Sequence, residues 1–273
     1  MHYAIEIVPF GEFSDPHVVM RLAQAADAAG WEGLFLWDHL AYVFGWPGGD
    51  PWVLLSAVAA TTSRLKLGVD VTPLPRRRPQ VLAHTLVTLD RLSQGRVIFG
   101  AGLGGTNEEF EIFGEPMDVK RRAAMLDEGL VLLDSLLRGE NVDYQGSYYT
   151  AKGVTMTPLP VQQPRPPIWI GGESKAALRR AARWDGWVIP GANMEGQMEK
   201  SPEWLAEQVA EIRAQRVSKD PFEVAINGVS AIGDSALPQT YAAAGATWWM
   251  ECLFGMRGSV EEMMRRVEAG PPS

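Results

Sequence analysis

The chain has 273 residues, 46% of them hydrophobic, a length that can bury a sizeable core as one α/β barrel or as two modest domains. Lys and Arg number 25 against 33 Asp and Glu, and the net charge of -8 argues against a nucleic-acid-binding or polybasic membrane-surface protein. The single cysteine, Cys252, cannot form an internal disulfide, fits a reducing compartment and is expected in the core. The first residues do not resemble a signal peptide, and no apolar run is long enough to span a bilayer, so we expect a cytoplasmic protein.

The first half of the chain alternates short apolar runs with amphipathic segments. Strands are expected over 3–8, 33–37, 65–71 and 96–102. Each is followed by a helical pattern, over 16–29, 51–62, 79–93 and 120–137. Pro79 begins the third helix, and Gly30, Gly95 and Gly139 follow the ends of the first, third and fourth.

Residues 140–166 interrupt this alternation. The sequence "VDYQGSYYT" predicts a small hairpin that turns at Gln145 and Gly146, and "TPLPVQQPRPP" predicts an extended, proline-rich crossing. Because the alternation resumes at once, we interpret 140–166 as an excursion from one domain and not as a linker between two.

The second half supplies four more units. Strands are expected over 167–172, 186–190, 222–228 and 247–253, with helices over 174–184, 202–215, 235–244 and 259–268. Strict alternation of strands and helices implies a parallel sheet, and eight units favour a closed barrel over an open, doubly wound sheet. The sequence therefore predicts the α/β class and a single (β/α)8 TIM barrel over 1–273, with the excursion after the fourth unit.

In such a barrel the working residues lie at the carboxyl ends of the strands. These ends hold few nucleophiles and many glycines, which suits a large flat ligand better than a hydrolytic site. His39, beside Asp38, is either an acid–base group or a polar residue of the barrel rim. The four histidines lack the spacing of metal ligands, so no metal site is predicted.

The stretch "IWIGGES" (168–174) places Gly171, Gly172 and Ser174 where a strand gives way to a helix. They could form a tight turn with a helix cap, or an anion site in which a phosphate approaches the backbone. The segment "GAGLGG" (100–105) lacks the full dinucleotide-binding pattern. The run Arg76–Arg78 is more often a solvated loop than part of a site.

Six segments together resemble the luciferase-like monooxygenase superfamily, which includes bacterial luciferase, alkanesulfonate monooxygenase and the coenzyme F420-dependent reductases and dehydrogenases. The resemblance extends over nearly the whole chain and rests on "GWEGLFLWDHL", "SRLKLGVDVTPLPRRRP", "GRVIFGAGLGGTNEEFEIFG", "LDEGLVLLDSLLRGE", "YQGSYYT" and the proline-rich run into "PPIWIGG".

The resemblance implies a TIM barrel that binds FMN or coenzyme F420 at the mouth. A non-proline cis peptide bond is expected at Asp70–Val71, behind the flavin ring. The cofactor phosphate is expected at Gly171, Gly172, Glu173, Ser174 and Lys175. Trp37 and Asp38 are expected near the ring, with Gly102, Gly104 and Gly105 on the rim and His39 as the catalytic residue.

By the same resemblance, the protein oxygenates a small organic substrate with reduced FMN and O₂, or transfers a hydride with F420. A flavin reductase or an F420 reductase is expected as the electron source, and a homodimer as the assembly. One departure concerns Gly105, which stands where some F420-dependent relatives carry a glutamate that acts on substrate, while Glu108 and Glu109 are shifted along the chain. The alternatives are a non-catalytic flavin-binding relative and a phosphosugar-type isomerase or aldolase barrel.

Overall fold

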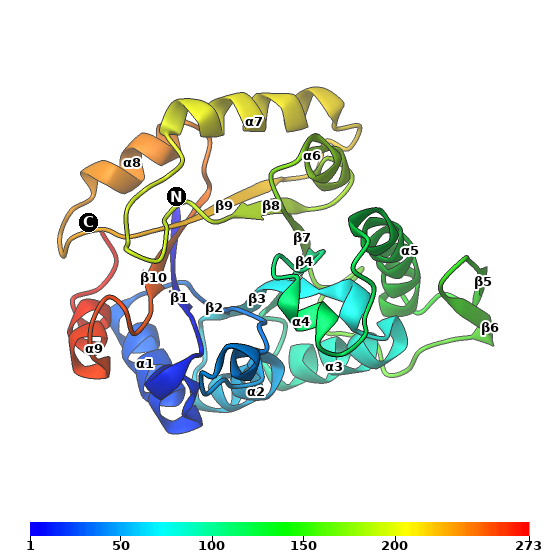
Figure 1. Ribbon diagram of the computed structural model, residues 1–273, viewed down its shortest axis with the longest axis horizontal. Coiled ribbons are helices and arrows are strands. Elements are labelled where there is room, and N and C mark those ends of the chain that lie inside the picture. Colours follow the sequence, from blue (N-terminus) through cyan, green and yellow to red (C-terminus); the bar gives the residue numbers. More distant parts are fainter. Residues whose placement is uncertain (273) are drawn as a thin grey trace.

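The computed structural model describes residues 1–272 and has a closed barrel of eight parallel strands at its centre (Figure 1). The strands are β1 (His2–Ile7), β2 (Gly33–Leu36), β3 (Lys66–Pro73), β4 (Val97–Gly102), β7 (Ile168–Gly171), β8 (Gly186–Ile189), β9 (Glu223–Gly228) and β10 (Trp248–Leu253). They are neighbours in this order, and β10 pairs with β1 to close the barrel. The predicted α/β class and TIM barrel are confirmed.

Eight helices follow these strands and surround the barrel (Figure 1). They are α1 (Pro16–Ala29), α2 (Pro51–Thr61), α3 (Pro79–Leu92), α5 (Val119–Leu137), α6 (Lys175–Ala181), α7 (Pro202–Gln215), α8 (Ala236–Ala243) and α9 (Val260–Glu268). Helix α6 ends earlier than predicted, because the chain must turn back into β8. Trp184 N–H bonds to the Ala181 carbonyl, and Asp185 N–H already pairs with the Ile168 carbonyl of β7.

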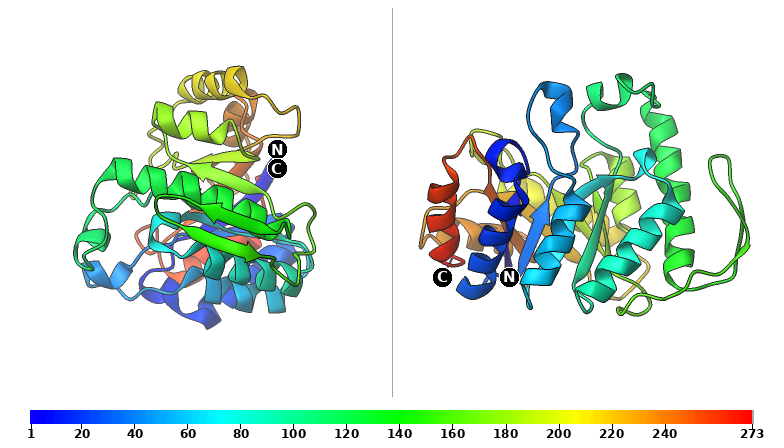
Figure 2. Two further views of the ribbon diagram at one scale, coloured as in Figure 1. Left: turned by 90° about the vertical axis from the view of Figure 1, so that its right-hand side faces the viewer. Right: turned by 90° about the horizontal axis from the view of Figure 1, so that it is seen from below.

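Four short helical segments that the sequence did not predict follow the first four strands. They are η1 (Gly11–Ser14), η2 (Ala41–Phe44), η3 (Leu74–Arg76) and α4 (Glu108–Glu111). The segments after β2 and β4 stand above the barrel in the right-hand view of Figure 2, and the rings of Tyr42 and Phe113 lie 6.3 Å apart. These loops build the mouth at the carboxyl ends of the strands.

Two apolar cores flank the barrel wall. The larger lies between the strands and the helices, and a smaller one fills the barrel interior with Ala4, Phe35, Ile98, Trp169, Val188, Ala225, Trp248 and Met250. Successive side chains of a strand face opposite sides. Residues two places beyond an interior residue, such as Glu6 after Ala4 and Trp37 after Phe35, therefore face inward at the mouth.

The excursion lies outside the barrel, beyond α5 (Figures 1 and 2). Strands β5 (Val142–Gln145) and β6 (Thr150–Val154) form the predicted antiparallel hairpin, with its turn over 146–149. The proline-rich crossing after it contains cis bonds at Thr157–Pro158 and Gln163–Pro164. Among residues 1–272, none of the helices is both long and apolar enough to cross a membrane.

Candidate active site

A cavity of about 500 Å³ opens at the carboxyl ends of the strands. Of the residues predicted for the site, twelve line it: Trp37, Asp38, His39, Asp70, Val71, Gly102, Gly104, Gly105, Gly171, Gly172, Glu173 and Ser174. Lys175 is the exception, since it is exposed in the first turn of α6 and does not line the cavity. The structure thus brings together predicted residues from four strand ends, those of β2, β3, β4 and β7.

Val71 projects into this cavity from an irregular part of β3. The pairing of β3 with β4 shifts register between Val69 and Thr72, and the Asp70–Val71 peptide bond is cis, as predicted. A Cβ on Gly102 would lie 2.4 Å from Val71 Cγ2, and one on Gly171 would lie 2.8 Å from Val71 Cγ1. These two glycines therefore make room for the Val71 side chain.

The chain from Gly172 to Ser174 forms a turn that contacts within the protein stabilise without a ligand. Gly172 has a φ of 108°, a conformation that favours glycine, and its carbonyl accepts a 2.8 Å hydrogen bond from Trp187 Nε1. Ser174 caps α6 by accepting from Ala177 N at 3.2 Å, which leaves its hydroxyl hydrogen free to donate. Lys200 Nζ lies 2.7 Å from Glu173 Oε2 and balances its charge.

His39 is hydrogen-bonded to a buried glutamate. Its Nδ1 lies 2.8 Å from Glu109 Oε1, which also accepts from Leu40 N at 3.0 Å. A carboxylate can only accept, so this contact places the hydrogen on Nδ1 and leaves Nε2 available to a ligand. The His39 side chain is 28% exposed and that of Glu109 only 2%, so the histidine is the member of the pair that can reach substrate.

Arg76 holds Glu109 in place from the other side. Its Nη2 donates to Glu109 Oε2 at 2.9 Å, its Nε donates to Glu115 at 3.3 Å, and its guanidinium lies over the Phe110 ring. Burial raises the pKa of Glu109, but the hydrogen bonds and charges of His39 and Arg76 outweigh it and lower the pKa below its usual value. Glu109 is therefore a stable negative charge beneath His39.

The prediction of a solvated loop at Arg76–Arg78 is wrong for its first two residues. Arg76 is 10% exposed in its side chain, and Arg77 donates to Asp38 Oδ2 through Nη2 at 2.7 Å and through Nε at 3.1 Å. Burial raises the pKa of Asp38, although the charge and hydrogen bond of Arg77 act in the opposite direction. Arg77 thus supports Asp38 of the predicted site, and Arg76 supports Glu109, the partner of His39.

Three polar side chains inside the barrel form the floor of the cavity. Asn227 Nδ2 donates to Glu6 Oε2 at 2.8 Å, while its Oδ1 accepts from the backbone N–H groups of Gly191 and Ala192. Glu6 is completely buried, and its Oε1 has no hydrogen-bond partner. Burial raises the pKa of Asp70 well above its usual value, and the neighbouring charge of Glu6 adds to this effect. Folding therefore favours the protonated form of Asp70 beside Glu6.

The raised pKa of Asp70 predicts how the stability of the fold depends on pH. A carboxyl group whose pKa is raised by folding stabilises the fold below its unfolded pKa, and this stabilisation is lost as pH rises through the folded pKa. Asp70→Asn, which keeps the shape of the side chain but cannot ionise, should remove that loss. We expect the urea midpoint of Asp70→Asn to decline less than that of the wild type between pH 5 and 9. Asp143→Asn, at an exposed hairpin position, is the control; parallel profiles for all three proteins would contradict the assignment.

Comparison with known proteins identifies the fold family. Residues 6–250 match the sequence profile described as luciferase-like monooxygenase. The chain belongs to this family. An uncharacterized protein of Mycobacterium tuberculosis is 32% identical over 221 residues, which cover 74% of each chain.

Two solved structures have the same fold. The F420-dependent tetrahydromethanopterin reductase from Methanopyrus kandleri is 18% identical, with a TM-score of 0.77 over 98% of this chain and 96% of its own. The oxygenating constituent of 3,6-diketocamphane monooxygenase from Pseudomonas putida, solved with FMN, is 17% identical, with a TM-score of 0.68 over 84% of this chain and 67% of its own.

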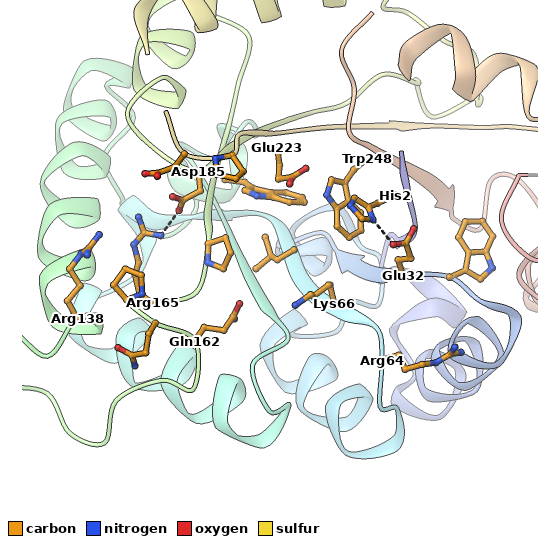
Figure 3. Close-up of a pocket in the computed structure, with 18 of the residues that line it drawn as sticks. His2, Glu32, Arg64, Lys66, Arg138, Gln162, Arg165, Asp185, Glu223 and Trp248 are labelled. Atoms are coloured by element: carbon orange, nitrogen blue, oxygen red, sulfur yellow. Dashed lines mark hydrogen bonds and ion pairs between the residues drawn. The ribbon is translucent and has the colours of Figure 1, made fainter. Parts of the chain in front are cut away.

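A second and larger cavity, of about 860 Å³, lies at the opposite end of the barrel (Figure 3). It is lined by residues at the amino ends of strands, among them His2, Lys66 and Glu223. Figure 3 shows the pairs His2–Glu32 and Arg165–Asp185 on its walls, so much of its charge is already compensated. In TIM barrels this end contributes stability and the other end carries chemistry, so the mouth cavity is the candidate active site.

Several residues of the mouth were not predicted from the sequence. Glu6 and Asn227 on the floor and Arg76 behind Glu109 belong to this group, and Glu109 itself was noted only as shifted from the position of a family glutamate. Cys252 lies in the core as expected, and burial raises the pKa of its thiol well above the usual value. Within residues 1–272 no group of three His, Cys, Asp or Glu side chains is placed to hold a metal ion.

Proposed function

We propose that this protein is an oxidoreductase that uses FMN or coenzyme F420 to act on a small organic substrate at the mouth of the barrel. The observation that carries the proposal is the His39–Glu109 pair on one wall of the mouth cavity. His39 Nδ1 and Glu109 Oε1 lie 2.8 Å apart. Family membership supports a redox function, since the solved relatives include an F420-dependent reductase and an FMN-binding monooxygenase.

The mouth cavity fits a flat, bulky cofactor. Its volume of about 500 Å³ lies in the range of small-molecule sites, roughly 300–1,000 Å³. Its walls are apolar at Val71, Leu103 and Val188. Gly102 and Gly171 have no side chains that would crowd Val71. A bound flavin or deazaflavin supplies two-electron redox chemistry.

The residues of this chain would handle the proton that accompanies such a reaction. His39 Nε2 would donate a proton to a substrate oxygen or accept one from it, because Nδ1 is engaged by Glu109. The buried carboxylate of Glu109 would stabilise the imidazolium form and fix the orientation of the ring, as the carboxylate does in Ser-His-Asp triads. Arg76 and Glu109 would act as positioning residues behind His39.

We also propose that the cofactor phosphate binds beside Gly172, Glu173 and Ser174. All three line the cavity, the Ser174 hydroxyl has a free hydrogen, and Lys200 balances the charge of Glu173. Lys175, which was predicted for this site, is left out because it lies away from the cavity.

A charge placed at Ser174 tests this phosphate site. Ser174→Asp should weaken FMN binding about tenfold or more, because an added carboxylate repels the phosphate and each charge-assisted hydrogen bond is worth roughly 1.5–3 kcal/mol. Ser174→Asn is the matched control, since Asn and Asp both cap helices and differ in charge. In Ser174→Asp, titration should show weaker binding of FMN but unchanged binding of riboflavin, which lacks the phosphate. If the cofactor is F420, the same comparison is made between F420 and its phosphate-free deazaflavin core. Equal losses for both ligands would argue against a phosphate contact.

Absorbance and fluorescence titrations of the protein with FMN and, separately, with F420 test the proposed function itself. Binding of either cofactor at one equivalent, followed by turnover on a panel of alcohols, aldehydes and ketones, would support it. Stoichiometric binding without turnover would favour a non-catalytic flavin-binding relative. Phosphosugar barrels usually bind phosphate after the seventh and eighth strands, whereas Gly172–Ser174 follows the fifth barrel strand, β7.

The same proposal includes the setting in which the protein works. A flavin reductase or an F420 reductase would supply its electrons, and residues 1–273 would form one luciferase-like domain, of which Ser273 lies outside the described residues. The single buried cysteine is compatible with a reducing cytoplasm. A homodimer is the assembly that a light-scattering measurement would test.

A further inference from the structure

A third cavity, of about 540 Å³, lies beside the proposed active site at the same end of the barrel. The loops after β1, β2, β8 and β10 enclose it, and its walls include Phe10, Phe44, Trp46, Met194, Phe254 and Met256. We call it the apolar annex. Phe44, Trp46 and Met256 are 44%, 54% and 61% exposed, so an apolar ligand could remove considerable hydrophobic surface from water.

The apolar annex adjoins the wall that carries His39. The ring of Phe10 lies 6.1 Å from the His39 ring in an edge-on arrangement, and Trp37 lies 5.7 Å from the same ring. Phe10, Trp37 and Met194 pack on one cluster of Val8, Cys252 and Phe254. A molecule lying along Phe10 would therefore have one end in the annex and the other at His39.

The annex offers nothing that would bind an anion. Its ionisable wall residue is Glu12, which is exposed, and no lysine or arginine of residues 1–272 lines it. Arg257 lies in the same loop, but its Nη1 donates to Glu251 Oε1 at 3.0 Å and its side chain is 14% exposed. The N-terminus of α9 is closed by Ser259 and Glu262, which form a capping box. A carboxylate, sulfonate or phosphate buried here would lack a partner, which is costly.

We propose that the apolar annex binds the uncharged, hydrophobic part of the substrate and so restricts this enzyme to neutral apolar molecules with a small polar group at the reacting end. This inference rests on the proposed function, because it names the substrate class of the same site. The methionines on the walls fit it, since their flexible side chains adapt to chains of different shape.

Gly255 provides the variant that tests the charge preference. It lies on the annex wall, and a Cβ added there would meet only Phe13 Cε2, at 3.9 Å, so a longer side chain can be introduced without moving the backbone. Gly255→Lys adds a cation to the annex. Gly255→Met is the matched control, with a side chain of similar length and no charge.

The probes are decan-2-ol and 9-hydroxydecanoate, which share one chain but differ at the far end, a methyl in the first and a carboxylate in the second. Binding is measured by calorimetric titration, with and without bound cofactor. The wild type and Gly255→Met should bind decan-2-ol at least about tenfold more tightly than 9-hydroxydecanoate, a difference of roughly 1.4 kcal/mol. In Gly255→Lys this ratio should fall to about one or invert.

Three results would overturn the inference: equal binding of both probes to the wild type, binding of neither, or the same ratio in Gly255→Lys and Gly255→Met. A fourth would be a change in molecular mass by light scattering in Gly255→Lys with unchanged probe binding, which would make the annex a contact between copies of the chain. Cofactor titrations on the same preparations keep the two proposals apart. Failure to bind FMN or F420 counts against the proposed function, whereas loss of probe discrimination counts against the apolar annex alone.

Discussion

His39→Ala should lower turnover by roughly 10²–10⁴-fold while leaving cofactor affinity within about threefold of the wild type. The imidazole stands on the cavity wall with Nε2 unengaged, so its removal takes away the group that exchanges a proton with substrate. Steady-state turnover and spectral titration of the cofactor, made on the same protein, separate these two quantities.

Glu109→Gln tests the contribution of the carboxylate in the His39–Glu109 pair. The amide keeps the shape of the carboxylate but cannot stabilise an imidazolium, so turnover should fall by about tenfold or more and its pH dependence should change. His84→Ala, at an exposed position of α3, is the control and should behave as the wild type. If His39→Ala turns over as fast as His84→Ala, then His39 is a structural residue of the rim.

The barrel could be predicted because its information is local. Each strand–helix unit shows the period of its own element, and proline and glycine mark the boundaries; the predicted 16–29 and 202–215 coincide with α1 and α7. The short segments η1, η2, η3 and α4 could not be predicted in this way, because three or four residues hold about one helical turn. These segments shape the mouth, so the functional end of the barrel was the less predictable end.

Glu109 is a site residue that could not be identified from the sequence. The pattern "NEEF" holds two adjacent glutamates, and the turn of α4 determines which of them reaches His39. That turn is held by Phe110, whose ring lies between the guanidinium groups of Arg76 and Arg122, at 4.4 and 4.2 Å. Contacts between residues so distant along the chain leave no periodic signal.

Glu6, by contrast, could have been found from the sequence. In "YAIEIV" it occupies the same face of the strand as Ala4, and a charged residue on the interior face of a barrel strand must have a partner. The partner, Asn227, lies 221 positions away, and sequence reasoning could not have supplied it.

The glycines at the strand ends give the last prediction. They were expected to admit a phosphate or a flat ring, and the structure adds a different requirement, because Gly102 and Gly171 accommodate the side chain of Val71. A methyl group at Gly102 would lie 2.4 Å from Val71 Cγ2 and would force the valine toward the cavity. We expect Gly102→Ala to reduce the free energy of unfolding by about 1–3 kcal/mol, the usual cost of overpacking, and to weaken cofactor binding about tenfold.

Two further variants make this steric explanation testable by urea unfolding and cofactor titration. Gly105→Ala, in the same loop, should change stability by less than about 0.5 kcal/mol, because a Cβ there meets nothing within 4 Å. Val71→Ala should rescue Gly102→Ala, since it removes both Cγ methyl groups, and the double-mutant cycle should show a favourable coupling of roughly 1 kcal/mol or more. If the two substitutions are additive, Val71 is not what requires glycine at position 102, and the loss must come from strain in the backbone of β4.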